Sequence, residues 1–420
     1  MRVLVLGSGG REHALAWKIQ QSPTCEKVYL HPGNAGTQRL GLENLGEIGP
    51  ADGNTIAKKA STLGVKLIVI GPEALLAVGL ADLFREKGFL VFGPGKKAAQ
   101  LESSKVFAKE FMERARIPTS SFLTAEDDRE LMALGEERHS FPVVLKLDGL
   151  AAGKGVVIAQ NNRDILDFTD RVWRHREFGD GPHRVVVEEF IEGVEVSYIG
   201  LCDGHRFLPL ESATDYKRLH DEQMGPNTGG MGAVSPSPFF NDLLKQKIED
   251  RIINPVLQQL QKEGLEFQGA LFIGLMIDPH GNPQVLEFNT RLGDPETQVI
   301  LLRMKSDLLP YLVAAAERNL EKMPPMEWTS DTSVYVVAAA EGYPEKPQAG
   351  DVISGWETMN EAQLFFSGVA DLNGQLVTQG GRVLGVGSLG AEQSQARTTA
   401  YRNLSRILWR GMHFRKDIGG

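Results

Sequence analysis

Short apolar strands alternate with helical stretches over residues 2–95, and this alternation restricts the fold more than any other feature of the sequence. Each predicted strand is followed by Gly or Pro and is short enough to be a buried strand of a parallel sheet. The strands are expected at 3–6, 27–30, 67–70 and 90–92, with helices at 12–21 and 76–87. Ligands of such sheets bind at the carboxyl ends of the strands. The sequence has "GSGGREH", "HPGNAGT" and "GPEALL" there, so we expect this edge to hold a ligand.

The first of these loops resembles a dinucleotide-binding loop only in part. Gly7 and Gly9 fit the start of the G-x-G-x-x-G pattern, but Glu12 stands where the third glycine is required. No acidic residue clearly follows the second strand either, which ends in "YLHPGNAG". A glycine-rich turn before a helix still favours an anion. The loop therefore suits a small phosphate better than NAD.

Length, charge and cysteine content exclude several classes of protein. A chain of 420 residues predicts two to four domains, and a net charge of −9 argues against a protein that coats nucleic acid. The two cysteines, Cys25 and Cys202, are far apart and favour a reducing cytosol over a disulfide scaffold. Because no apolar run reaches the length of a membrane span, we expect no membrane partner.

A second, larger α/β region is predicted over residues 119–320, followed by a Pro-rich linker at 321–328 and a C-terminal region of short strands. The segments "LFIGLMID" and "QVLEFN" predict an antiparallel hairpin. Predicted strands lie at 143–147, 156–159, 185–189, 194–200, 333–340, 350–356, 362–370 and 380–390. Predicted helices lie at 104–114, 243–263 and 298–319, and a final amphipathic helix carries Ala396, Ala400, Leu404, Ile407 and Leu408.

The stretch "GLAAGKG" at 149–155 resembles a phosphate loop but departs from the Walker A pattern. Only three residues separate Gly149 from Gly153, and Gly155 follows Lys154 where a hydroxyl residue should stand. The stretch joins two predicted strands, which excludes the P-loop architecture. A glycine-rich hairpin can fold over phosphates and offer backbone N–H groups, with Lys146 supplying a charge. A mobile turn with a solvated lysine is the alternative.

The stretch "VLEFNTRLGDPETQ" at 285–298 has the residue types of a metal and phosphate site. Glu287 and Asn289 project from one face of a strand, and their oxygens suit Mg²⁺, while Leu286 and Phe288 are expected to pack on the other face. Arg291 can clamp a phosphoryl or carboxylate group. A polar edge strand is the alternative, but it leaves three polar groups in a row without packing.

The stretch "PNTGGMGAVSP" at 226–236 has too many glycines and prolines for regular structure. It is either a linker or a loop lying against a ligand. Asp215, Lys217 and Arg218 precede it and place mixed charge beside it. A solvated charge run is the alternative interpretation.

Taken together, these motifs resemble the ATP-grasp superfamily and, more closely, the glycinamide ribonucleotide synthetase (phosphoribosylamine–glycine ligase) family. The resemblance covers residues 1–418 in family order. The matching stretches are "GSGGREHALAWK", "PGNAGT", "GPEALL", "KLDGLAAGKGV", "EEFIEGVEVS", "GPNTGGMGA", "FNTRLGDPETQ", "LRMKSDL", "GGRVL" and "RKDIG".

The resemblance implies an α/β multidomain protein with three parts. These are a Rossmann-like preATP-grasp domain at 1–103, a two-part α+β ATP-grasp domain at 104–325 with a small lid near 119–192, and a small mixed β/α domain at 326–420. It also implies a cytoplasmic enzyme of purine biosynthesis that joins glycine to 5-phosphoribosylamine through glycyl phosphate, with ATP as co-substrate and Mg²⁺ or Mn²⁺. The choice of metal and the oligomeric state stay open, with a monomer among the options.

The resemblance further implies roles for individual residues. The expected ATP-binding residues are Lys105, Lys146, Gly153, Lys154, Gly155, Glu188, Ile191 and Glu195. The expected metal ligands are Glu287 and Asn289, and the expected catalytic residues are Arg291, Lys146 and Asp294. The expected substrate-binding residues are Gly9, Gly10, Arg11, Asn34, Glu73, Asp215, Lys217, Arg291 and Asp294.

Two other classes of enzyme compete with this interpretation. Another ATP-grasp enzyme, such as a biotin-dependent carboxylase component, would share the glycine-rich loop and the metal strand, but "GPNTGGMGA" and "GSGGREH" argue against it. A dehydrogenase that uses the N-terminal glycines would leave the strand with Glu287, Asn289 and Arg291 unexplained.

Overall fold

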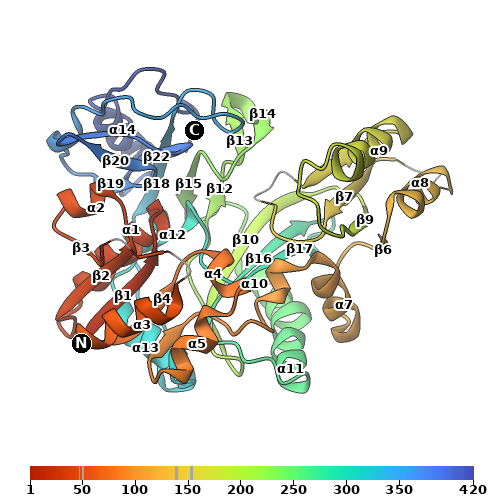
Figure 1. The fold of residues 1–420 in the computed structure, drawn as a ribbon, viewed down its shortest axis with the longest axis horizontal. Coiled ribbons are helices and arrows are strands. Elements are labelled where there is room, and N and C mark those ends of the chain that lie inside the picture. The colour runs from red at the N-terminus through yellow and green to blue at the C-terminus, as the bar shows by residue number, and fades with distance from the viewer. Residues whose placement is uncertain (47, 50–51, 138–140, 152–154) are drawn as a thin grey trace.

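The computed structural model describes residues 1–46, 48–49, 52–137, 141–151 and 155–420. A larger body contains both termini, and a smaller lid of strands and helices projects from it (Figure 1). Within these described ranges, four sheets of four or five strands form the framework of the fold. The predicted α/β multidomain fold is thereby confirmed.

The N-terminal part is a five-stranded parallel sheet in the order β3-β2-β1-β4-β5. Its strands are β1 (Arg2–Gly7), β2 (Lys27–Pro32), β3 (Glu43–Asn44), β4 (Val65–Ile70) and β5 (Leu90–Phe92). Its helices are α1 (Gly10–Gln20), α2 (Ala35–Arg39), α3 (Gly53–Thr62), α4 (Glu73–Ala77) and α5 (Leu80–Glu86). The four predicted strands are confirmed, while the two-residue β3 was not predicted.

Both faces of this sheet are buried, which explains why its strands are apolar throughout. Val3 and Val5 of β1 face a core shared with α1 and with helices from later in the chain. Leu4 and Leu6 alternate with them and face a second core formed with α3 and α5. The N-terminal sheet is therefore held between its own helices and the middle of the chain.

The lid is an antiparallel sheet in the order β6-β9-β7-β8, covered by two helices. Its elements are β6 (Phe122–Ala125), α8 (Asp128–Glu137), β7 (Val143–Leu147), β8 (Val156–Ala159), α9 (Asn162–Thr169) and β9 (Val185–Glu189), with a π-helical turn at Asp170–Arg174. Two short helices, α6 (Gln100–Ser103) and α7 (Lys105–Ala115), lead into it. The predicted strands 143–147, 156–159 and 185–189 are confirmed to the residue.

The second part of the middle region is an antiparallel sheet in the order β11-β10-β16-β17. The predicted hairpin is its β16–β17 pair. The strands are β10 (Val194–Cys202), β11 (Phe207–Pro209), β16 (Gly269–Ile277) and β17 (Pro283–Asn289). The helices are α10 (Asp242–Ile248), α11 (Asn254–Lys262), α12 (Glu296–Arg303) and α13 (Leu308–Ala316), and a π-helical turn at Glu249–Ile253 joins the first two.

The C-terminal sheet includes two strands from the middle of the chain. Its order is β12-β15-β18-β22-β19, so that β12 (Thr214–Asp215) and β15 (Gly232–Ser235) extend strands contributed by the last 90 residues or so. The other strands are β18 (Thr332–Ala339), β19 (Gln363–Phe366) and β22 (Arg382–Gly390). Two hairpins, β13 (Arg218–His220) with β14 (Met224–Asn227) and β20 (Val369–Leu372) with β21 (Gln375–Thr378), and helix α14 (Gln393–Leu404) complete this part.

Several predicted elements differ from the structure. The helix expected at 76–87 is two helices, because Gly79 is left-handed with φ of +89° and ends the first turn. The helix expected at 298–319 breaks after Arg303, and Asp307 caps a new helix by accepting a bond from Leu309 N. No strand forms at 350–356, where only isolated bridges occur, and 362–370 forms two strands. The last helix ends at Leu404, which leaves Leu408 exposed.

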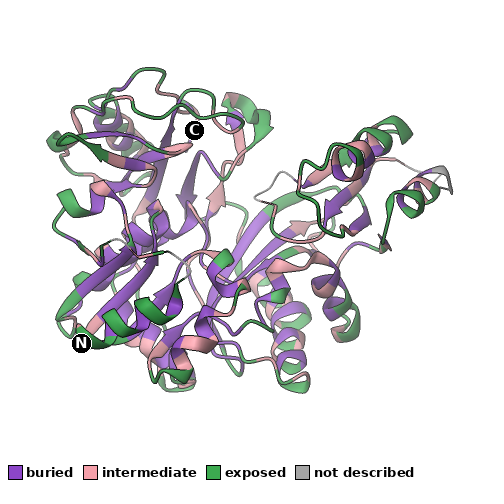
Figure 2. Ribbon diagram, viewed as in Figure 1, coloured by how far each residue is buried: buried purple, intermediate pink, exposed green. Residues whose placement is uncertain are grey.

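Buried residues follow the central strands, and exposed residues concentrate on the outer faces of the helices (Figure 2). Over the residues that the structure describes, no helix is long and apolar enough to cross a membrane.

Candidate active site

Strand β17 brings Glu287 and Asn289 together on one face. Asn289 Nδ2 donates to Glu287 Oε1 over 3.3 Å, and the Glu287 side chain is open to solvent. The register with β16 shifts beside Gly274, so that Val285 and Phe288 both enter the core. Leu286 is only half-buried and lies outside that core, so the expectation that it packs together with Phe288 is wrong. The bulge breaks the simple alternation of the strand.

Three lysines surround Glu287, and we call them the cation cluster: Lys105, Lys146 and Lys217. Although the surrounding protein partly desolvates the carboxylate, their ammonium groups lower the pKa of Glu287. The lysines come from α7, from β7 of the lid and from the segment after β12. Residues from three separate stretches therefore meet at the end of β17.

Glu188 connects two lysines beneath the lid sheet. Its Oε1 lies 2.9 Å from Lys146 Nζ, and its Oε2 lies 3.1 Å from Lys109 Nζ. Lys109 also donates to Thr119 Oγ1 and Ser120 Oγ, each over 2.8 Å. All three charged groups are buried. The carboxylate of Glu188 is thus shared by two lysines. One of them, Lys109, was not predicted from the sequence.

The glycine-rich hairpin is tied to α7 at its first residue. Gly149 has φ of +100°, and its carbonyl accepts a hydrogen bond of 2.8 Å from Lys105 Nζ. Strands β7 and β8 on either side pair antiparallel, so the stretch joins two strands as predicted. Gly153 and Lys154 lie outside the described residues, and Gly155 is buried at the start of the return strand. Predicted ATP contacts by these residues stay predictions.

The remaining residues predicted to bind the nucleotide lie where β9 leads into β10. Ile191 is half-buried in this connection, and Glu195 near the start of β10 forms an ion pair with Lys217. Although burial opposes it, the charges of Glu195, Glu287 and Asp215 raise the pKa of Lys217. Lys217 therefore carries its positive charge at neutral pH.

Arg291 is held by carboxylates from the N-terminal part and from α6. Its Nη2 lies 3.1 Å from Glu102 Oε1 and donates to Asn289 Oδ1 over 3.0 Å. Its Nε lies 3.5 Å from Glu73 Oε2 and has no hydrogen-bond partner among the described residues. Glu102 was not predicted, because only the tertiary fold brings α6 next to Thr290, whose N–H it also accepts over 2.7 Å.

Asp215 and Glu296 form an acidic pair beside the "PNTGG" loop. Burial, reinforced by the charge of Glu296, raises the pKa of Asp215 well above its usual value, and burial also raises the pKa of Glu296. A Cβ atom on Gly230, whose φ is +106°, would lie 2.6 Å from Asp215 Oδ1 and 2.4 Å from Pro295 Cδ. The loop therefore needs glycine to pass between these groups, and it packs on the site rather than serving as a linker. The expectation that residues 226–236 lack regular structure is wrong at both ends, because the end of β14 and the whole of β15 lie within them.

Asp294 is fixed by two residues that the sequence analysis did not assign. Arg382 Nη2 lies 3.1 Å from Asp294 Oδ2, and Gln298 Nε2 donates to Asp294 Oδ1 over 2.8 Å. Although burial opposes it, Arg382 lowers the pKa of Asp294. Gln298 is 1% exposed and its Oε1 has no partner among the described residues, next to Gly10 at the start of α1.

The N-terminal glycine loop is partly filled by its own chain. Glu12 Oε2 accepts a hydrogen bond of 2.8 Å from Gly9 N, and its carboxylate packs against Gly7 and Gly71. A carboxylate at this position leaves no room for a pyrophosphate over the turn. A Cβ atom on Gly10 would lie 2.9 Å from Gln298 Nε2, so this glutamine packs against the start of α1. This arrangement argues against dinucleotide binding, as predicted from the missing third glycine.

Arg11 and Asn34 make structural contacts that were not foreseen. Arg11 Nε donates to Glu12 Oε1 over 2.6 Å, and its Nη1 donates to Leu292 O over 3.0 Å. Asn34 caps α2 and donates to Ser8 O over 2.7 Å and to Phe366 O over 3.2 Å. Both side chains join the N-terminal loop to other parts of the site.

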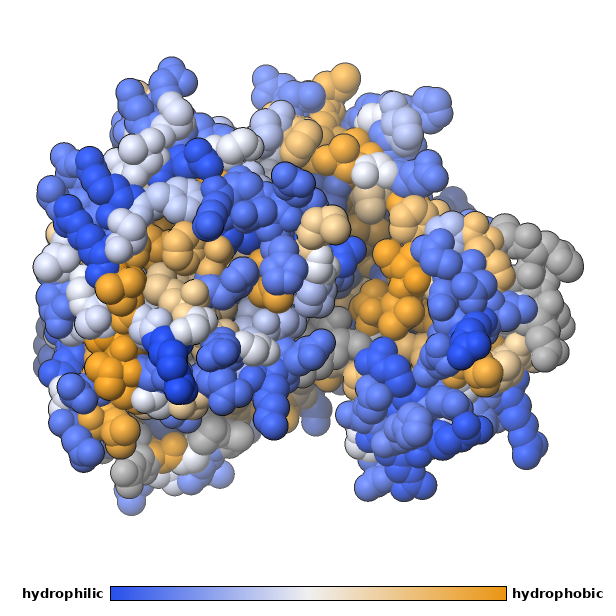
Figure 3. Space-filling model, turned by 90° about the horizontal axis from the view of Figure 1, so that it is seen from above, coloured by the Kyte–Doolittle hydropathy of each residue, from blue (hydrophilic) through white to orange (hydrophobic). Residues whose placement is uncertain are grey.

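The predicted site residues from the cation cluster to Asp294 thus gather between the lid and the body. Viewed from above, the surface is hollowed between these two parts (Figure 3). Among the described residues, no group of three or more His, Cys, Asp and Glu side chains could hold a metal ion alone. Glu287 with Asn289 fits Mg²⁺, which takes one or two protein oxygens and completes its shell with phosphates and water.

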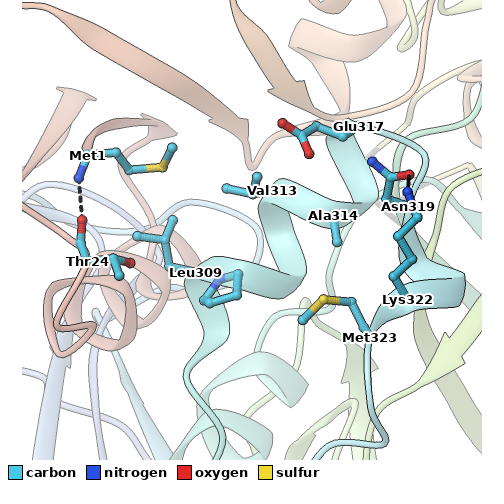
Figure 4. A pocket seen from close by; sticks show the side chains of 10 residues that line it. Met1, Thr24, Leu309, Val313, Ala314, Glu317, Asn319, Lys322 and Met323 are labelled. Carbon is cyan, nitrogen blue, oxygen red and sulfur yellow. Dashed lines mark hydrogen bonds between the residues drawn. The ribbon is translucent and has the colours of Figure 1, made fainter.

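A separate surface pocket of about 430 Å³ contains none of these residues. Met1 and Thr24 line one side of it, and α13 and the turn that follows line the other (Figure 4). Its walls are mainly apolar and include Leu309, Val313 and Met323. Because none of the predicted catalytic, metal-binding or nucleotide-binding residues lines it, it is not the candidate active site.

The chain matches three successive parts of one protein family. These are the phosphoribosylglycinamide synthetase N domain over residues 1–102, the ATP-grasp (A) domain over 103–297 and the C domain over 333–420. A phosphoribosylamine–glycine ligase of Ralstonia nicotianae is 45% identical over 420 residues, which cover 100% of this chain and 99% of the relative.

Solved structures share this fold both at high and at low sequence identity. A phosphoribosylamine–glycine ligase of Thermotoga maritima superposes with a TM-score of 0.87 at 37% identity, and the match covers 100% of both chains. The biotin carboxylase domain of the 2-oxoglutarate carboxylase of Hydrogenobacter thermophilus superposes with a TM-score of 0.72 at only 18% identity, over 98% of this chain and 91% of that one. The second likeness is one of fold alone.

Proposed function

We infer that this chain, which belongs to the phosphoribosylglycinamide synthetase family, uses ATP to join glycine to 5-phosphoribosylamine in purine biosynthesis. The observation that carries this conclusion is the full-length match across all three family domains at 45% identity. A biotin carboxylase activity is disfavoured because that likeness stays at 18% identity. The roles of individual residues, the metal and the cytoplasmic location remain proposals.

ATP binds between the lid and β17, with its phosphates at the cation cluster. Lys105 and Lys146 supply positive charge from the two sides, and the hairpin that begins at Gly149 covers the phosphates. Glu188 acts mainly by holding Lys146, since its carboxylate is already shared by two lysines. The adenine then contacts the connection around Ile191, and the ribose contacts Glu195.

Glu287 and Asn289 would hold Mg²⁺ or Mn²⁺ through one carboxylate and one amide oxygen, once the Asn289 amide turns so that Oδ1, which accepts from Arg291 Nη2, faces the ion in place of Nδ2. Bound there, the ion would supply Lewis-acid stabilisation of the phosphoryl oxygens. Arg291 has a spare buried donor, Nε, for the group being transferred. Glu102 and Glu73 orient its guanidinium so that little reorganisation is needed during the reaction.

Glycine is recognised by the acidic pair. A buried carboxylate pair favours either a shared proton or a cation, and an amino acid brings an ammonium group of suitable charge. Asp215 Oδ1 has no partner among the described residues and is free to accept from that group. Phosphoribosylamine enters from the other side, where the N-terminus of α1 suits its phosphate and the unpartnered Oε1 of Gln298 can accept from its amine or hydroxyl groups.

The reaction proceeds in two displacements. A carboxylate oxygen of glycine attacks the γ-phosphorus, the bond to the β–γ bridging oxygen breaks, and ADP leaves. The amine nitrogen of phosphoribosylamine then attacks the acyl carbon of glycyl phosphate and expels phosphate, and the proton that the nitrogen loses is taken up by the departing phosphate. Glycyl phosphate hydrolyses readily, so closure of the lid must exclude water. Asp294 is engaged by Arg382 and Gln298 and stays ionised, which suits orientation of the amine better than proton transfer.

The function is tested by ADP formation with purified protein. ADP release that requires glycine and phosphoribosylamine together, with bicarbonate inactive as a replacement for glycine, is the expected result. Release that depends on bicarbonate and biotin would instead indicate a carboxylase. Mass spectrometry of the product separates amide formation from simple hydrolysis of ATP.

A further inference from the structure

The C-terminal tail, residues 413–417, contacts the segment that carries Asp215 and Lys217 on the side away from the active site. In Figure 1 the C-terminus lies next to the β13–β14 hairpin. Lys416 N donates to Asp221 Oδ1 over 2.7 Å, and Glu222 N donates to Asp417 Oδ2 over 2.9 Å. His413 Nε2 also lies 2.9 Å from Leu219 O. The last residues of the chain are therefore fastened to the hairpin that directly follows Lys217.

Arg415 is the centre of this attachment. Its side chain is fully buried, and Nε and Nη2 bind the two carboxylate oxygens of Asp417 at 2.7 and 2.6 Å. Nη1 donates to Arg218 O and to Gln223 Oε1, each over 3.1 Å. The guanidinium also lies over the ring of Tyr216, with 5.1 Å to its centroid.

These contacts surround Lys217 in sequence. Tyr216 precedes it and Arg218 follows it, so Arg415 holds both neighbours while making no recorded contact with Lys217 itself. The other side of the segment is fixed by β15 and by the bond from Met231 N to Tyr216 O, which is 2.9 Å long. The two attachments leave the ammonium group of Lys217 directed to Glu195 and Glu287.

Only arginine can make this set of contacts at once. The planar fork binds a carboxylate with two parallel bonds, has further N–H groups for a carbonyl and an amide oxygen, and stacks on an aromatic ring. Burying a charge without such partners would be costly. The arrangement is therefore specific for a guanidinium, which a purely space-filling role does not require.

We propose that Arg415 is a positioning residue for the ligase reaction, which sets Lys217 and Asp215 in place from behind the active site. The proposal rests on the proposed function of those two residues. Misplacement of a reacting or binding group by about 1 Å lowers rates by about 100-fold. Loss of Arg415 is accordingly expected to lower kcat by about 10- to 100-fold. KM for ATP is expected to rise by a smaller factor, because Lys217 is displaced from the cation cluster whereas Lys105 and Lys146 do not contact the tail.

The test compares the full-length variants Arg415→Ala and Arg415→Lys with Arg85→Ala. Arg85 also donates to carbonyls, those of Val91 and Gly93, but lies in the N-terminal part. Arg85 is half-buried, so Arg85→Ala controls for the general loss of stability when an arginine that donates to backbone carbonyls is removed. We expect a lower kcat in both Arg415 variants, recovery of Arg415→Ala by added guanidinium, and normal kcat in Arg85→Ala. Normal turnover in Arg415→Ala, or an equal loss in Arg85→Ala at a similar decrease in Tm, would overturn the proposal.

Amide hydrogen exchange gives a readout that does not depend on the reaction. Exchange of residues 214–219 is expected to accelerate in Arg415→Ala but not in Arg85→Ala. Unchanged exchange would overturn the positioning role even if the reaction is as proposed. Failure of the unmodified protein to form ADP with both substrates would instead count against the proposed function.

Discussion

Replacement of His13 by Asn is expected to remove a pH-dependent part of the protein's stability. His13 lies on α1, is 1% exposed and packs between Phe365 and Phe366 of β19. Its Nδ1 accepts a hydrogen bond of 2.8 Å from Phe366 N, so this nitrogen carries no proton in the folded protein. The contact joins the N-terminal part to the C-terminal sheet beside Ser367.

The size and sign of the effect follow from the pKa. Burial lowers the pKa of His13 from 6.5 to about 4. The unfolded chain therefore binds a proton between these values while the folded protein does not. This stability is fully present above pH 6.5 and is lost as the pH falls to about 4, and it amounts to about 3 kcal/mol at most. Asn keeps an acceptor near the position of Nδ1 but cannot titrate in this range.

The measurement is urea unfolding of the unmodified protein and of His13→Asn at a series of pH values from 7.5 to 4, followed by tryptophan fluorescence and circular dichroism. The variant loses some stability at every pH from the smaller side chain, so the slope with pH is the relevant quantity. We expect a shallower slope below pH 6.5 in His13→Asn and an unchanged slope in His205→Asn, which alters an exposed histidine. Equal slopes for the unmodified protein and His13→Asn would refute the reasoning.

Four further outcomes are expected from the candidate active site. Arg291→Ala should lower kcat about 100-fold without a matching change in Tm, because one preorganised donor is lost; near-normal kinetics would show that its ion pairs with Glu102 and Glu73 are only structural. Glu287→Gln should raise the Mg²⁺ concentration needed for half-maximal activity, and an unchanged titration would move the metal elsewhere. Glu296→Gln should raise KM for glycine and leave KM for ATP near normal, and the reverse pattern would contradict the glycine site. Burial lowers the pKa of Lys109 to about 8, so KM for ATP should rise as the pH increases through this value and Lys109 loses its charge. The rise should be absent in Lys109→Met; if it persists in the variant, another group causes it.

Local patterns predicted most of the fold. The lid strands at 143–147 and 185–189 were placed correctly, because short apolar runs rich in Val and bounded by turn residues are typical of buried strands. The helix expected at 76–87 was wrong at Gly79, where a left-handed residue separates two short helices that periodicity alone joins. The break after Arg303 has a different cause: Met304 is extended, and Asp307 caps a new helix inside one apolar pattern.

The partners of the site residues could not be found in this way. Lys109 sits on an amphipathic helix and looks like a solvated residue until β9 brings Glu188 against it. Glu102 and Arg382 lie far from Arg291 and Asp294 in sequence, and only the packing of separate parts joins them. The residue types of the site were visible in short motifs, whereas the residues that orient them depend on long-range contacts.

The sharing of one sheet by two regions of the chain limits how the protein can be divided. In the intact protein, residues 232–235 of β15 pair with residues 333–336 of β18. A fragment ending at residue 325 would keep β15 but lose this partner strand. The reciprocal fragment would expose the edge of β18 and invite aggregation. Separately expressed pieces are therefore expected to be insoluble alone and to recover activity only when they reassociate, so a working split protein needs its cut in an exposed loop outside this shared sheet.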